Sequence, residues 1–204
     1  MITEIYILDL LGTLAFSIYG SYFALKKDFD IFGIFVCAFL TAVGGGTIRD
    51  LFLNVDPAYF SDHWYLIVIS MGMAITIYLY HHFHRIKKFV RILDSIGLVT
   101  FAFIGASKAH LMGYETGALL FFAGITAVGG GVLRDLVLNE IPEIMYRDFY
   151  ATIALLLGFI FALFPEEFSE NFIWANILLI SLFIVRIVII IFNIHLWKPK
   201  KIKK

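Results

Sequence analysis

The chain has 204 residues, of which 61% are hydrophobic and 16% are charged. Soluble domains are nearer half apolar and a quarter charged, so this composition, with a mean hydropathy of +0.89, excludes a soluble globular protein and indicates a chain embedded in the lipid bilayer. The basic and acidic residues balance at 16 each, so the net charge gives no sign of a nucleic-acid partner.

Seven apolar stretches are long enough to cross a membrane, which takes roughly 20 residues in a helix. They cover about residues 5–25, 31–53, 64–80, 93–112, 117–138, 149–164 and 172–196. The connections between them are short, so the sequence predicts an all-α membrane protein with a single transmembrane domain spanning residues 1–204. The N-terminus lacks the basic segment of a signal peptide, and we expect the first stretch to be retained as a helix.

Lys and Arg residues in the connections gather at one end of the predicted bundle. They follow the first stretch at 26–27, the third at 85–91 and the seventh at 198–204, whereas the opposite connections carry only acidic charge. Cytoplasmic loops are the ones enriched in Lys and Arg. Seven spans therefore place the N-terminus outside and the C-terminus in the cytoplasm.

An internal repeat relates the first three stretches to the next three. Segment 41–54 recurs as 126–139, at an offset of 85 residues, and both copies contain Thr-Ala-Val-Gly-Gly-Gly followed by Arg-Asp-Leu. Repeat one covers about 5–83, repeat two about 90–168, and a seventh helix at about 172–196 belongs to neither. Because each copy has three helices, the second must lie inverted in the membrane, an arrangement common in transporters.

The glycine runs are the first candidate site. The residues are Thr41, Gly44, Gly45 and Gly46 in repeat one and Thr126, Gly129, Gly130 and Gly131 in repeat two. Each glycine gives up about 1 kcal/mol of helix propensity relative to alanine, and lets the backbone bend so that carbonyls can line a pore. The alternative is close helix packing through small residues. Matched positions in both halves favour the pore.

Charged residues inside the spans are the second candidate site. The set comprises Asp9, Arg49, Asp50, Asp94, Arg134, Asp135 and Lys108. Adjacent residues point to different parts of a helix surface, so we expect neither Arg-Asp dipeptide to satisfy itself fully. Depth in the membrane instead predicts that Asp9 pairs with Arg49 and that Asp94 pairs with Arg134. Such pairs neutralise charge, or hold and gate the helices of a pore.

Lys108 and Arg186 are further cations within the spans. Lys108 lies about one turn from the outer end of its helix, and its repeat counterpart is Phe23. Two interpretations stay open: the Lys108 side chain extends to the lipid headgroups, or it faces the pore and competes with permeating cations. Arg186 lies deeper and needs a partner that the sequence does not identify.

The sequence has no HExxH, P-loop, GxSxG or paired-cysteine motif, so we expect no enzyme activity, metal site or cofactor. Two GGG-x-x-Arg-Asp motifs, in the second and fifth of seven helices with inverted three-helix repeats, resemble the prokaryotic trimeric intracellular cation (TRIC) channels. The related bacterial domain has also been labelled a glycine transporter. The resemblance covers nearly the whole chain.

This resemblance implies a homotrimer in a prokaryotic plasma membrane. Each subunit would have its own pore, lined by helices one, two, four and five, that passes monovalent cations, chiefly potassium, and is shaped by the glycine runs. The alternative is a secondary transporter of a small solute such as glycine. The scarcity of polar groups at the midplane favours the channel, and the two glycine runs disfavour a scaffold without transport.

Overall fold

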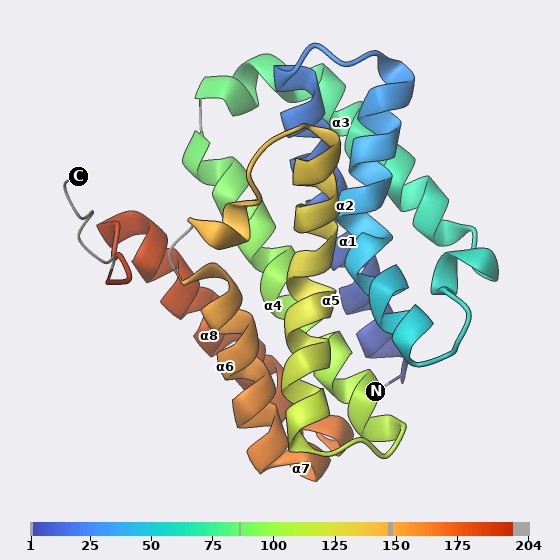
Figure 1. The fold of residues 1–204 in the computed structure, drawn as a ribbon, viewed down its shortest axis with the longest axis vertical. Coiled ribbons are helices and arrows are strands. Elements are labelled where there is room, and N and C mark those ends of the chain that lie inside the picture. Colours follow the sequence, from blue (N-terminus) through green and yellow to red (C-terminus); the bar gives the residue numbers. More distant parts are fainter. Residues whose placement is uncertain (1, 86, 147–148, 198–204) are drawn as a thin grey trace, which may run out of the picture.

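A computed structural model describes residues 2–85, 87–146 and 149–197, which form helices and turns without a strand (Figure 1). The long helices are α1 (Ile2–Lys26), α2 (Ile31–Phe52), α3 (Trp64–Arg85), α4 (Lys87–Leu111), α5 (Thr116–Val137) and α8 (Phe172–Phe192). The short ones are η1 (Ala58–Phe60), η2 (Glu143–Met145), α6 (Tyr150–Leu163) and α7 (Pro165–Glu170). Among the described residues, six helices are long and apolar enough to cross a membrane, and the protein is an all-α integral membrane protein.

The sixth predicted stretch forms a shorter helix than expected. α6 has 14 residues and ends just before Pro165, whose ring disfavours the helical conformation in the residue that precedes it. Pro165 then begins the separate helix α7, which the sequence did not predict. Its first turn contains Glu166 and Glu167, where acidic side chains interact favourably with the helix dipole.

The basic segment that was expected to be a loop after the third stretch is mostly helical. α3 continues to Arg85, and α4 begins at Lys87. Lys and Arg are good helix formers, so a run of basic residues marks the end of a membrane span without ending the helix. The basic tail at 198–204 lies outside the described residues.

α2 and α5 lie side by side at the centre of the bundle and run in opposite directions (Figure 1). α1 and α3 pack on the α2 side, α4 and α6 pack on the α5 side, and α8 lies against α4 and α6. α1 and α4 also contact each other and run in opposite directions. The four helices α1, α2, α4 and α5 therefore form the core.

Glycines set the distance between α2 and α5. A Cβ on Gly45 would overlap the carbonyl oxygen of Thr126, and a Cβ on Gly130 would overlap that of Thr41. Both helices continue without a break through their glycine runs. These glycines therefore allow two backbones to touch, which is the packing role of small residues in membrane helices.

The third glycine of each run has a different environment. A Cβ on Gly46 would lie 3.6 Å from the Arg49 guanidinium, and one on Gly131 would lie 3.7 Å from the Tyr150 hydroxyl. Both distances are ordinary contacts. The third glycine thus leaves space beside a polar cluster instead of admitting a neighbouring backbone.

Gly45→Ala and Gly130→Ala are expected to lower thermal stability, because the new methyl group would overlap a backbone carbonyl that cannot rotate away. Overpacking commonly costs about 1–3 kcal/mol, and a fixed backbone places these variants at the upper end. Gly117→Ala is the matched control, since a Cβ there has no neighbour within 4 Å. Thermal unfolding in detergent measures the effect, and equal melting temperatures for all three variants would contradict the packing role.

Candidate functional site

α2 and α5 end with the same turn, which fixes an Arg-Asp dipeptide at each end of the bundle. After α2, Asn54 adopts the left-handed conformation with φ of 53°, and the Val55 N–H donates to the Asp50 carbonyl at 3.0 Å. Asn139 repeats this geometry after α5, with φ of 53°. Asparagine tolerates this conformation, so the Leu-Asn sequence closes both helices with a Schellman-type cap.

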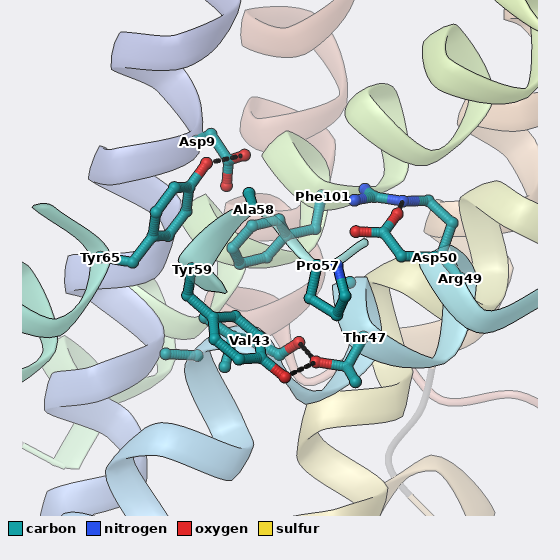
Figure 2. Close-up of a pocket in the computed structure, with 12 residues that line it drawn as sticks. Asp9, Val43, Thr47, Arg49, Asp50, Pro57, Ala58, Tyr59, Tyr65 and Phe101 are labelled. Atoms are coloured by element: carbon teal, nitrogen blue, oxygen red, sulfur yellow. Dashed lines mark hydrogen bonds and ion pairs between the residues drawn. The ribbon is translucent and has the colours of Figure 1, made fainter. Parts of the chain in front are cut away.

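We call the cluster at the end of α2 the outer cluster and the one at the end of α5 the inner cluster, after the orientation that the sequence predicts. The outer cluster centres on Asp50, which is 2% exposed. Its Oδ1 accepts hydrogen bonds from Arg49 Nε at 2.7 Å and from Lys108 Nζ at 2.8 Å. Nearby on α1, Asp9 Oδ2 accepts a hydrogen bond of 2.7 Å from the Tyr65 hydroxyl (Figure 2). Two cations therefore share one buried carboxylate at this end.

The inner cluster centres on Arg134, which is 1% exposed. Its Nε and Nη2 donate to Asp135 Oδ1 at 2.8 and 2.6 Å, and Nη2 also donates to Glu143 Oε2 at 3.2 Å. On α4, Asp94 Oδ1 accepts a hydrogen bond of 2.8 Å from the Tyr150 hydroxyl. Here one buried guanidinium is shared by two carboxylates.

The predicted pairing of Asp9 with Arg49 and of Asp94 with Arg134 is wrong. In the described part of the chain, each arginine is paired with the aspartate that follows it, and the other two aspartates accept hydrogen bonds from tyrosines. The side chains of adjacent helical residues do leave the helix in different directions. The arginine side chain is nevertheless long enough to fold back and place its planar guanidinium group against the next carboxylate.

The Lys108 side chain bonds a residue of α2, so the interpretation that it extends to the lipid headgroups is wrong. Its partner Asp50 lies on the other repeat, and the Lys108 side chain keeps 33% of its surface exposed. At the matching inner position, the ring of Phe23 lies 4.7 Å from the Arg134 guanidinium, which also lies 4.6 Å from the ring of Tyr19. An aromatic ring can stabilise a buried cation in this way.

Tyr65 and Tyr150 were missed by the sequence analysis, although a signal was present. They are separated by 85 residues, as are Asp9 and Asp94, to which they donate hydrogen bonds. A comparison of polar residues at the repeat offset would have identified both tyrosines.

Glu143 was also missed, and the repeat could not have revealed it because its counterpart is Ala58. Its Oε2 accepts a hydrogen bond from the Tyr19 hydroxyl at 2.7 Å, and its backbone N–H donates to Asp135 Oδ2 at 2.7 Å. Glu143 therefore links η2 to α1 and α5 at the inner end.

Arg186 of α8 is 1% exposed, and its guanidinium lies 5.4 Å from the ring centre of Tyr150. Since Tyr150 also bonds Asp94, α8 is connected to the inner cluster through this tyrosine.

A small cavity adjoins the outer cluster (Figure 2). Its volume is about 30 Å³, which is room for about one or two water molecules. Its polar lining comes from Asp9, Thr47, Arg49, Asp50, Tyr59 and Tyr65. Asp62, which precedes α3, is not part of this lining. It accepts hydrogen bonds from the Tyr6 hydroxyl and the Trp64 N–H, and these bonds lower the pKa of Asp62.

The fold and the two clusters define a class of protein: an all-α membrane protein whose two central antiparallel helices touch through glycine and carry buried ion pairs at opposite ends. A family model described as glycine transporter matches residues 6–81 and 91–166. The chain belongs to this family.

Relatives and solved structures agree with this assignment. The chain is 38% identical to a UPF0126 inner membrane protein, YadS, of Escherichia coli strain K12, over 81% of each chain. It matches a structure solved to explain conductance through TRIC cation channels, with a TM-score of 0.88 and 33% identity over 97% of this chain and 98% of that one. It also matches the TRIC orthologue from Rhodobacter sphaeroides, with a TM-score of 0.86 and 29% identity over 94% and 100%. The resemblance to prokaryotic TRIC channels is confirmed.

Asp50→Asn is expected to destabilise the protein by about 3–5 kcal/mol, because it leaves the buried Arg49 guanidinium without its carboxylate. Lys108→Met removes the lysine charge from the same cluster and should lower the stability by about 1 kcal/mol or less. Lys108 is partly exposed, and Asp50 keeps its ion pair with Arg49 in this variant. Thermal unfolding of the two variants in one detergent compares them. Equal losses of stability would show that Asp50 is not the centre of this cluster.

Proposed function

We propose that this protein is a potassium-permeable cation channel that assembles as a homotrimer with one pore in each subunit. The supporting observation is the match to a TRIC cation channel structure over 97% of the chain, at a TM-score of 0.88 and 33% identity. The match extends over all the membrane helices, so it includes the elements that would line a pore.

The proposed pore follows the axis between α2 and α5, from the outer cluster past the glycine runs to the inner cluster. In this conformation the path is shut, because Gly45 and Gly130 each lie against the backbone of the opposite helix. Conduction therefore requires α2 and α5 to bend or move apart. Such a movement would also separate the Leu133 and Ile48 side chains from Gly44 and Gly129, against which they pack.

The charged clusters would hold the ends of α2 and α5 while their centres move. Lys108 is the member best able to leave its partner, because its side chain is 33% exposed whereas that of Asp50 is 2% exposed. In this role Lys108 competes with permeating cations for the outer carboxylates.

A second candidate is a transporter of glycine, which the description of the matched family model favours. The outer cavity has only about 30 Å³ of room. A glycine zwitterion is larger than the one or two waters that fit there. The size of the cavity therefore supports the channel over the transporter.

We also propose that α6 is the seventh membrane crossing, which places the N-terminus outside and the C-terminus in the cytoplasm. α7, whose first turn contains the acidic Glu166 and Glu167, lies at the end of the bundle where α1 begins, and α1 finishes at the other end with the basic Lys26 in its last turn. With the inner-membrane relative, this supports a plasma-membrane location.

Purified protein in planar bilayers should show unitary potassium currents, and its native mass should be that of three chains. Channel currents exceed any transporter turnover, so they separate the two candidates. Lys108→Met should raise the cation current, because it removes a positive charge next to the proposed path. Glycine uptake without unitary currents would overturn the channel, and a monomeric or dimeric mass would overturn the trimer.

For the orientation, Glu167→Cys should react with a membrane-impermeant maleimide in intact cells, whereas His82→Cys should react only after the cells are opened. The native Cys37 is buried and gives no background. Both engineered positions are exposed in the structure. Labelling of His82→Cys from outside intact cells would reverse the proposed topology.

A further inference from the structure

The two ends of the fold differ at positions that the repeat makes equivalent. Thr47 and Tyr59 line the outer cavity, whereas Val132 and Ile144 line the matching pocket at the inner end. The outer cavity has a volume of about 30 Å³, while the pocket that the described residues form at the inner end has essentially none. Only the outer pocket of this pair thus combines space with hydroxyl groups.

Oxygen atoms around the outer cavity retain lone pairs. One oxygen of Asp9 accepts from Tyr65, and no hydrogen bond between described residues uses the other. Thr47 donates its single hydroxyl hydrogen to the Val43 carbonyl at 2.8 Å, so Tyr59 must be the donor in the 3.2 Å contact between the two hydroxyls. The phenolic oxygen of Tyr59 and the second oxygen of Asp9 are therefore available to a further ligand.

We propose that the outer cavity binds one small monovalent cation, such as K⁺ or Na⁺, through the Asp9 carboxylate and the hydroxyl oxygens of Thr47 and Tyr59. Protein oxygens can replace the hydration shell of an alkali cation, whereas Ca²⁺ takes six to eight oxygens, commonly from several carboxylates. The described residues bring no three His, Cys, Asp or Glu side chains together as a metal site. The place of this site in a conduction path rests on the channel proposed above.

The Lys108 ammonium competes with an incoming cation for the carboxylates at the cavity. This ammonium lies 2.8 Å from Asp50 Oδ1, and Asp50 also lines the cavity. Arg49 and Lys108 are both bonded to Asp50, so a cation that bound at Asp9 would meet two positive groups nearby, and departure of one of them would favour its binding. Arg49 is buried, but Lys108 is partly exposed and can swing to the outer surface when a cation enters.

An open groove lies next to the cavity at the outer end. The groove is lined by Leu51, Asn54, Asp56 and Phe60 and has a volume of about 280 Å³. It shares Thr47, Pro57 and Tyr59 with the cavity. A hydrated cation would therefore reach the groove first, and the 3.2 Å contact between the Thr47 and Tyr59 hydroxyls would have to open before it entered the cavity.

Thallium(I) tests the site directly, because it resembles K⁺ in charge and size and scatters anomalously. Crystals of the full chain soaked in thallium(I) nitrate should show an anomalous peak beside the Asp9 carboxylate, and the peak should vanish in Asp9→Asn. Absence of the peak in the wild-type protein, or its persistence in Asp9→Asn, overturns the proposal.

Solution measurements provide a second readout. Melting temperature is followed as K⁺ replaces N-methylglucamine at constant ionic strength, since a ligand of the native state raises it. Asp9→Asn should weaken the apparent affinity about tenfold or more, as expected for the loss of a charged ligand. Lys108→Met should strengthen it, and unchanged affinity in Lys108→Met contradicts the competition.

Two further variants complete the test: one changes a second proposed ligand, and the other is a control. Thr47→Val introduces the residue that the inner end carries at this position, so it should fold while weakening the affinity. Asp62→Asn removes the same charge as Asp9→Asn from a carboxylate that does not line the cavity, so it should leave the affinity unchanged. An equal loss in Asp62→Asn would reveal a surface-charge effect and overturn the site. A thallium peak without unitary currents overturns the channel alone, and currents without a peak overturn the site alone.

Discussion

A buried arginine in a membrane protein must find its counter-charge within the bundle, because lipid tails provide none. Arg134 is 1% exposed and Arg49 is 5% exposed, so neither can rely on water. Each takes the aspartate that follows it, in a helix end held by a left-handed asparagine. The remaining groups come from other elements: Lys108 from α4 at the outer end and Glu143 from η2 at the inner end. These pairings fix the ends of α2 and α5, around which the other helices pack.

Between the fixed ends, α2 and α5 touch through glycine. The overlap that a Cβ would produce at Gly45 or Gly130 shows that the two backbones are already as close as they can be. Such a contact rests on dispersion between closely packed surfaces, and the Leu133 and Ile48 side chains of the opposite helices pack beside Gly44 and Gly129. The proposed channel therefore requires these central contacts to separate while the ends of the two helices stay fixed.

The sequence predicted the long helices because a membrane span requires only apolar length, whereas it missed the break at Pro165 that shortens α6. For the site, it located the charged residues but not their partners. The rule for neighbouring side chains ignores the reach of arginine, so the Arg49–Asp50 bond was not predicted, although each dipeptide does need a further partner as expected. The bond from Lys108 joins two repeats, and no pattern within one repeat could reveal it.

Differences between the two halves show which charges the scaffold does not need. Packing accepts a phenylalanine at position 23, where the other half has Lys108, and an alanine at position 58, where the other half has Glu143. Both charges nevertheless bind the central Arg-Asp pairs, and they do so with opposite sign. The outer end thus gains a cation and the inner end gains a carboxylate. Because the repeat carries neutral residues at the counterpart positions, the shared scaffold does not dictate these two charges, and they give the two ends of the bundle opposite added charge.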